Sequence, residues 1–324
     1  MTPSWPMGGP PPPLRSGDWV GLVAASSALD SSERLEAGIE VLRGWGLEVE
    51  DPAHLLRRRW GYLAGGDRER AEDLRRRGPE GQRARLLACV RGGWGSARLL
   101  GEGGESPGAG PDAPSSPSWL LGFSDVTSLL WARWARGGAG GVHGPLITTL
   151  ASEPPWSRER LRGLLFGEGL PALEGEGWGG GIGQGPLLVG NLTVATHLLG
   201  TPHLPDLRGA IAVFEDVGEA PYRIERMLTQ WRLCGALEQL AGIGFGSFSG
   251  CVDQERMDQD RDTFFTTEQV LRERTADLGI PVVAKLSVGH TPGNAALPVG
   301  VWARLDGDKG LLEVDSTWPA PSGA

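Results

Sequence analysis

The chain has 324 residues, 40% of them hydrophobic and 22% charged, and its formal net charge is −9. A chain of this length can form two domains that each bury a hydrophobic core. The acidic balance argues against a nucleic-acid partner, because nucleic-acid binding requires a basic surface that displaces counterions from phosphates.

The N-terminal residues 1–16 are rich in proline, and we expect a disordered tail there. This tail lacks the basic-then-apolar order of a signal peptide, and no apolar run approaches the roughly 18 residues of a membrane span. The cysteines at 89, 234 and 251 are odd in number and far apart, which is typical of neither a disulfide framework nor a C-x-x-C metal pair. We therefore expect a protein of a reducing compartment, soluble and cytoplasmic, without membrane contact.

Strands and helices alternate between residues 17 and 165, which we expect to form the first domain. An apolar run over 19–24 indicates a buried strand, and Leu35, Ile39 and Leu42 then recur at helical spacing. Alternation of this kind predicts a parallel sheet with right-handed crossovers. Further elements are expected over 47–50 (strand), 67–77 (helix) and 85–90 (strand).

The apolar run 119–123 reaches Ser124 and passes at once into a helical pattern. Gly122 would let the backbone turn tightly, and a helix that begins beside the serine directs free N–H groups at any oxyanion formed there. The pattern predicts a nucleophile elbow, although Val126 stands where the second glycine of G-x-S-x-G would be. The alternative interpretation is an ordinary helix N-cap, since serine is favoured at that position.

Two segments lack helix or strand periodicity. Residues 101–118 are of low complexity, and we expect a disordered surface loop. Residues 166–186 are dominated by glycine, and we expect a linker between the domains. Its glycines at 181, 183 and 185 do not have the spacing of a dinucleotide fingerprint, and no P-loop lysine follows them, so no cofactor is expected.

The second half, residues 187–324, mixes strands and helices and ends in a pattern typical of a hairpin. We expect it to form a smaller α/β domain. Its predicted strands are 187–191, 210–214, 243–245 and 281–284, its helices are 193–199, 222–240 and 267–278, and its hairpin joins 299–305 to 311–314.

Ser124, Glu215 and His290 each come at the end of a predicted strand or just after it. Acyl transfer needs a hydroxyl activated by a neutral imidazole and a carboxylate that orients the imidazole. The residues alone also allow a structural role for Glu215, as a cap or surface ion pair, and for His290. The other histidines, at 54, 143, 197 and 203, show no metal-ligand spacing, so no metal is expected.

Six segments in this order resemble the LD-carboxypeptidases, serine peptidases of the S66 group that include the microcin-immunity peptidases. The resemblance implies a flavodoxin- or Rossmann-like N-terminal domain and a C-terminal α/β domain with a β-barrel-like sheet. It also implies a triad of Ser124, Glu215 and His290, an oxyanion hole at the backbone N–H groups of Gly93 and Asp125, and a homodimer. The matching segments are Arg91–Gly95 with Arg98–Leu100, Gly122–Thr127, His143–Pro145, Gly190–Leu192, Phe214–Leu228 and Gly289–Asn294.

The activity that the resemblance implies is release of terminal D-alanine from a murein tetrapeptide by cleavage of an L,D amide bond. A terminal carboxylate requires a cationic partner, for which Arg91 and Arg223 are candidates with Arg98 and Arg226, and Trp94 is expected in the substrate pocket. Trp94 replaces a tyrosine of the family, and Glu225 replaces an aspartate. Two other functions remain open: hydrolysis of peptidyl or aminoacyl adenylates, and peptide binding without turnover.

Overall fold

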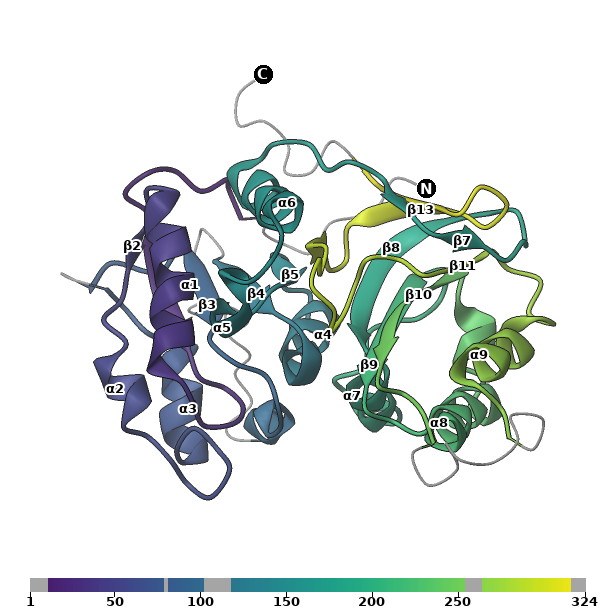
Figure 1. The fold of residues 1–324 in the computed structure, drawn as a ribbon, viewed down its shortest axis with the longest axis horizontal. Helices are drawn as coiled ribbons and strands as arrows, with labels where there is room; N and C mark the ends of the chain where they lie inside the picture. The colour runs from purple at the N-terminus through teal and green to yellow at the C-terminus, as the bar shows by residue number, and fades with distance from the viewer. Residues whose placement is uncertain (1–10, 79–80, 102–117, 254–263, 316–324) are drawn as a thin grey trace.

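The computed structural model describes residues 11–78, 81–101, 118–253 and 264–315, which form two lobes side by side (Figure 1). The first lobe contains a six-stranded sheet and the second an eight-stranded sheet. Most of the expected loop at 101–118 and residues 1–10 of the expected tail lie outside the described residues.

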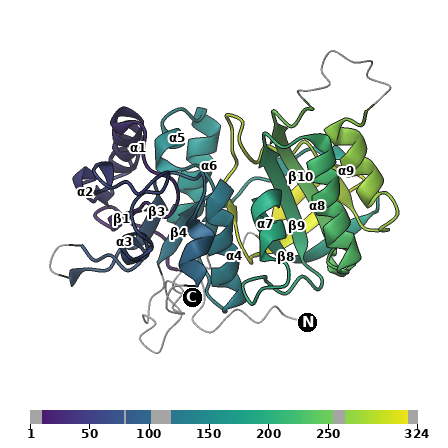
Figure 2. The same cartoon turned by 90° about the horizontal axis from the view of Figure 1, so that it is seen from below.

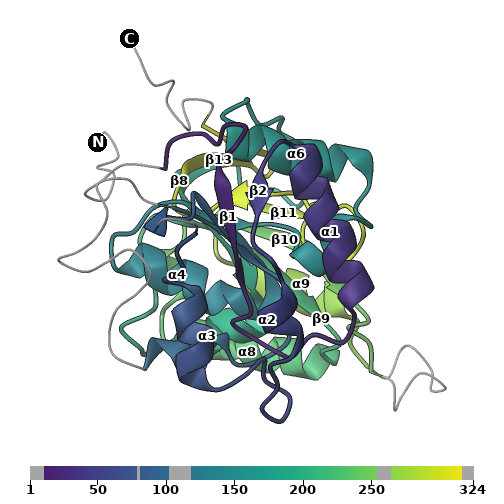
Figure 3. The same ribbon diagram turned by 90° about the vertical axis from the view of Figure 1, so that its left-hand side faces the viewer.

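The first sheet has the strand order β12-β5-β4-β3-β1-β2, and all its strands are parallel except β12. Helices cover both faces, with α1, α5 and α6 on one side and α3 and α4 on the other (Figures 2 and 3). The strands are β1 (Trp19–Val23), β2 (Glu48–Val49), β3 (Leu86–Cys89), β4 (Trp119–Gly122), β5 (Gly141–His143) and β12 (Leu297–Pro298). The helices are α1 (Ser32–Gly44), α2 (Ala53–Leu56), α3 (Asp67–Asp73), α4 (Thr127–Ala135), α5 (Ile147–Leu150) and α6 (Pro155–Phe166).

A parallel sheet covered on both faces requires strands that are apolar at every position. In β1, Val20 and Leu22 pack into one hydrophobic core, and Trp19 and Val23 pack into the core on the opposite face. The predicted parallel α/β class of this lobe is confirmed.

Gly38 lies where α1 crosses α5. A methyl group at this position would lie 1.8 Å from the carbonyl oxygen of Ile147, so the two backbones approach too closely for any side chain. We expect Gly38→Ala to lower the free energy of unfolding by about 1–3 kcal/mol, because overpacking against backbone outweighs the gain in helix propensity. Urea unfolding followed by circular dichroism measures the change.

The matched control is Gly44→Ala at the end of the same helix, where nothing lies within 4 Å of the added methyl group. This substitution should leave stability unchanged or raise it by up to about 1 kcal/mol. Equal stability of the two variants would show that the backbones of α1 and α5 do not meet at Gly38.

The second sheet has the strand order β6-β14-β13-β8-β9-β10-β11-β7, in which β8, β9, β10 and β11 are parallel. Helices α7, α8 and α9 lie on its outer side (Figure 2). The strands are β6 (Leu173–Glu174), β7 (Glu176–Gly177), β8 (Ile182–Asn191), β9 (Ile211–Val217), β10 (Gly242–Ser249), β11 (Val282–Ala284), β13 (Trp302–Asp306) and β14 (Leu311–Val314). The helices are α7 (Leu192–Leu198), α8 (Pro221–Leu233) and α9 (Thr267–Thr275).

The segment predicted as a linker, 166–186, contains β6, β7 and the first half of β8. Strands β6 and β7 are the two ends of the sheet and are separated by Gly175 alone, so the sheet nearly closes into the expected barrel. A Cβ at Gly175 would lie 2.4 Å from the Ala284 carbonyl oxygen, and one at Gly185 would lie 1.8 Å from that of Gly209. Close contact between backbones requires glycine, which removes the side-chain pattern that identifies a strand. The expected glycine-rich linker therefore contains strands of the second sheet, which its sequence pattern did not predict.

The described end of the proline-rich tail, residues 11–16, is packed against the first lobe. Leu14 is buried and its N–H donates to the Leu165 carbonyl, while the Trp119 indole N–H donates to the Pro12 carbonyl. This part of the tail therefore differs from the disorder expected of it. No helix among the described residues is both long and apolar enough to cross a membrane.

Candidate active site

Ser124 stands at a sharp turn between β4 and α4. Its φ is +62°, in the left-handed region that non-glycine residues rarely adopt. A Cβ on Gly122 would lie 2.8 Å from Val126 Cγ1 and 3.0 Å from Cys89 Cβ, so only glycine fits there. The helical turn 124–126 has Phe123 as its N-cap and no capping side chain. Ser124 is thus held in a strained elbow, and the alternative of an N-cap is wrong.

The structure brings together Ser124, His290 and Glu215, which come from both lobes. The Nε2 atom of His290 lies 3.1 Å from Ser124 Oγ, and its Nδ1 atom lies 2.5 Å from Glu215 Oε2. Glu215 is fully buried at the end of β9, whereas the imidazole is 19% exposed. Burial raises the pKa of Glu215 above its ordinary value, and the hydrogen bond with His290 opposes this shift. A hydroxyl, an imidazole and a carboxylate in this sequence of contacts can transfer the hydroxyl proton.

Gly289 allows His290 to approach Glu215. Its φ is +120°, and a Cβ there would lie 2.9 Å from Glu215 Cβ. His143, the nearest other histidine to the elbow in sequence, is fully buried in β5, and desolvation lowers its pKa to about 3. Phe123 packs against both histidine rings, with centroids 5.6 Å from His143 and 4.8 Å from His290. Of these two histidines, His290 is the one whose ring lies within hydrogen-bonding distance of the Ser124 hydroxyl.

The glycine-rich loop after β3 passes over the serine. A Cβ on Gly92 would lie 3.1 Å from Ser124 Cβ, and Gly93 has a φ of +107°. The N–H group of Gly93 has no hydrogen-bond acceptor among the described residues. Asp125 belongs to the first helical turn after the elbow, where backbone N–H groups have no acceptor within the helix. Gly92, which precedes Gly93, therefore lies against Ser124, and Asp125 follows the serine directly.

The Asp125 carboxylate joins this loop to the elbow, a role that sequence reasoning missed. Its Oδ2 atom accepts hydrogen bonds from the Ser26 hydroxyl (2.6 Å) and the Ser96 N–H (2.8 Å), and the Ser96 hydroxyl donates to the Asp125 carbonyl (2.6 Å). Asp125 is buried, and buried polar groups of this kind rigidify what they connect. Two features of the sequence could have indicated this role: Asp125 directly follows the serine, and Ser26 lies just past the first strand.

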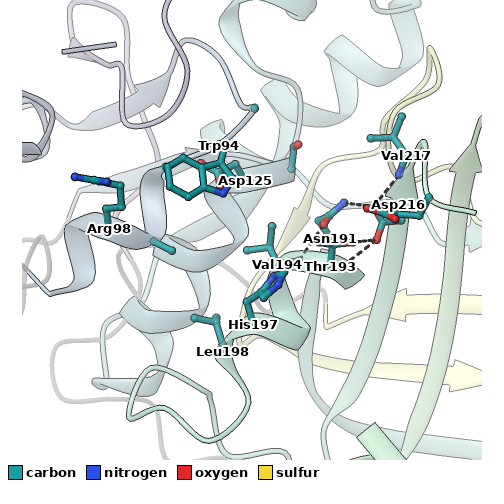
Figure 4. A pocket seen from close by; sticks show the side chains of 15 residues that line it. Trp94, Arg98, Asp125, Asn191, Thr193, Val194, His197, Leu198, Asp216 and Val217 are labelled. Carbon is teal, nitrogen blue, oxygen red and sulfur yellow. Dashed lines mark hydrogen bonds between the residues drawn. The ribbon is translucent and has the colours of Figure 1, made fainter. Parts of the chain in front are cut away.

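A cavity of about 500 Å³ opens beside Ser124 between the lobes. Trp94, Arg98 and Asp125 line it from the first lobe, and Asn191 and His197 line it from the second (Figure 4). A cavity of this size and position can hold a small peptide or nucleotide.

The three residues predicted to contact substrate have different positions. Trp94 lines the cavity and is half-exposed. Arg91 does not line it and instead forms an ion pair with Asp30 (2.7 Å). Arg223 is paired with Glu219 (3.4 Å), which does line the cavity. Among the described residues, no group of three or more metal-ligating side chains is gathered in one place.

Comparison with known proteins shows the family of the chain. Sequence models of the LD-carboxypeptidase N-terminal and C-terminal domains match residues 20–144 and 184–305. The chain is 47% identical to a putative carboxypeptidase of Synechocystis sp. over 302 residues, covering 93% of this chain and 96% of that protein. It is 34% identical to the murein tetrapeptide carboxypeptidase of Pseudomonas aeruginosa over 308 residues, covering 90% and 94%.

Among solved structures, the microcin C7 self-immunity protein MccF of Escherichia coli has the same fold. The TM-score is 0.77 at 22% identity, covering 94% of this chain and 97% of that one. The chain therefore belongs to the LD-carboxypeptidase family, the S66 peptidases, and is a peptidase-type hydrolase.

Proposed function

We propose that the protein is a serine LD-carboxypeptidase that removes the terminal D-alanine of a murein tetrapeptide. The observation that carries this proposal is the hydrogen-bonded series Ser124–His290–Glu215 at the edge of the cavity between the lobes. The similarity to the murein tetrapeptide carboxypeptidase of Pseudomonas aeruginosa supports the choice of substrate.

In the proposed reaction, the Ser124 oxygen attacks the carbonyl carbon of the L,D amide while His290 Nε2 takes its proton. Glu215 holds the Nδ1–H group and stabilises the imidazolium that forms. The N–H groups of Gly93 and Asp125 bind the tetrahedral oxyanion. His290 then protonates the leaving amine, D-alanine departs, and a water molecule hydrolyses the acyl-enzyme by the reverse proton transfers. A homodimer and a cytoplasmic location belong to the same proposal.

The substrate is tested by incubating the purified chain with murein tetrapeptide and, separately, with an aminoacyl sulfamoyl adenosine. We expect release of D-alanine from the tetrapeptide and no cleavage of the adenylate analogue. A tetrapeptide that ends in L-alanine is the matched control and should remain intact. Cleavage of the analogue alone would indicate an adenylate hydrolase, and binding of the tetrapeptide without cleavage would indicate a peptide-binding protein.

A further inference from the structure

The segment 289–294, here called the His290 loop, connects the two lobes. It follows β11 of the second sheet and is followed by β12, which pairs with β5 of the first sheet. Because His290 must lie within hydrogen-bonding distance of Ser124, the position of this loop on the first lobe determines the geometry of the site.

Glu153 holds the far end of the His290 loop. It lies between α5 and α6 in the first lobe and is 8% exposed. A single oxygen, Oε2, accepts hydrogen bonds from the N–H groups of Gly293 (2.7 Å) and Asn294 (3.1 Å). Hydrogen bonds from backbone N–H groups to a carboxylate are charge-assisted and stronger than neutral ones.

A continuous series of contacts leads from Glu153 to His290. Glu153 binds the backbone N–H group of Asn294. The side-chain Oδ1 atom of Asn294 in turn accepts a hydrogen bond from the N–H group of Gly289 (2.9 Å), the residue before His290. The Asn294 carbonyl accepts from the Ser157 hydroxyl (2.9 Å). Gly293 has a φ of +98° and packs so closely on Trp156 that a Cβ would lie 2.7 Å from the ring. The loop is therefore closed on itself and fastened to the start of α6.

We propose that Glu153 is a positioning residue that fixes His290 against Ser124 by binding the His290 loop to the first lobe. The inference rests on the proposed function, since it assigns His290 as the base. Glu153 lies at the opposite end of the loop from His290, and it acts through the loop backbone.

The test compares Glu153→Ala, Glu153→Asp and Glu153→Gln in the full-length protein. We expect Glu153→Ala to lower kcat for D-alanine release by about 10- to 100-fold with little change in KM, because a displacement near 1 Å disrupts proton transfer but not binding. Glu153→Gln keeps an acceptor oxygen at the same reach and should stay within about 5-fold of wild type. Glu153→Asp shortens that reach, so its loss should be intermediate, and it provides the result if the alanine variant does not fold.

Labelling of Ser124 by a fluorophosphonate provides a second readout that does not depend on the murein substrate. Its rate should fall in Glu153→Ala by the same factor as kcat. In a His290→Ala background, Glu153→Ala should change residual labelling by less than about 2-fold, because a residue that acts through His290 has no effect once His290 is absent. Asp306→Ala is the matched control: Asp306 is a buried carboxylate that accepts from the Lys309 N–H (3.0 Å) in the hairpin of the second lobe.

The positioning role would be overturned if kcat were unchanged in Glu153→Asp and also, provided that this variant folds, in Glu153→Ala. An equal loss of labelling with and without His290, or an equal loss in Asp306→Ala, would show a general effect on the fold and would also overturn it. A wild-type protein that is labelled but does not cut the tetrapeptide contradicts only the substrate. One that is neither labelled nor active contradicts the proposed function and this role with it.

Discussion

Replacing Ser124 with alanine is expected to lower kcat for D-alanine release by about 10⁴- to 10⁶-fold. The variant would lose the nucleophile and keep only binding and the oxyanion donors. His290→Ala should cause a similar loss, because the serine 3.1 Å from Nε2 would have no base to accept its proton. The double variant should be no slower than either single variant, since residues that act as one unit are not additive.

The measurement is kcat on the tetrapeptide, with circular dichroism to show that each variant is folded. Alanine at Ser16, an exposed serine far from the site in sequence, serves as the control and should retain wild-type turnover. If Ser124→Ala kept more than about 10% of wild-type kcat, acyl transfer to this serine would not be the mechanism.

The second large effect is expected at the Asp125 side chain. Asp125→Ala removes the carboxylate acceptor of Ser26 and Ser96, so the loop that carries Gly93 is held at the elbow only through the Asp125 carbonyl, which still accepts from the Ser96 hydroxyl. We expect kcat to fall by about 10²- to 10³-fold, as when one oxyanion donor is lost, with a smaller change in KM. Asp125→Asn should lose about 10-fold or less, because an amide oxygen at the position of Oδ2 can still accept from both the Ser26 hydroxyl and the Ser96 N–H, although without the charge of the carboxylate.

Fluorophosphonate labelling separates this effect from damage to the nucleophile, because Asp125→Ala should lower kcat while the Ser124–His290 contact remains. Thermal unfolding of both variants shows whether loss of the buried network also destabilises the first lobe. Equal and near wild-type kcat in the two variants would mean that the Gly93 loop keeps its position without the carboxylate.

The local sequence was sufficient to predict those helices and strands in which buried side chains recur with the period of the element itself. The apolar run of β1 and the spacing of Leu35, Ile39 and Leu42 in α1 predicted both correctly, because burial on a sheet or a helix face imposes a period on the sequence. The elbow at Ser124 was predicted from an apolar run, a glycine and the start of a helix, and its φ of +62° agrees.

Only the tertiary structure decided the features that depend on residues far apart in the chain. Strands β6 and β7 have two residues each, and the glycines 175 and 177 lie against the backbones of Ala284 and Gly307, so the segment is too short and too rich in glycine to show an alternating pattern. The two-residue strand β12 pairs with β5, and Glu153 binds Gly293 and Asn294 about 140 residues away. Such contacts satisfy backbone hydrogen bonds that any sequence carries, so no local periodicity marks them. They are what places His290, on a loop between the two sheets, within 3.1 Å of a serine in the first lobe.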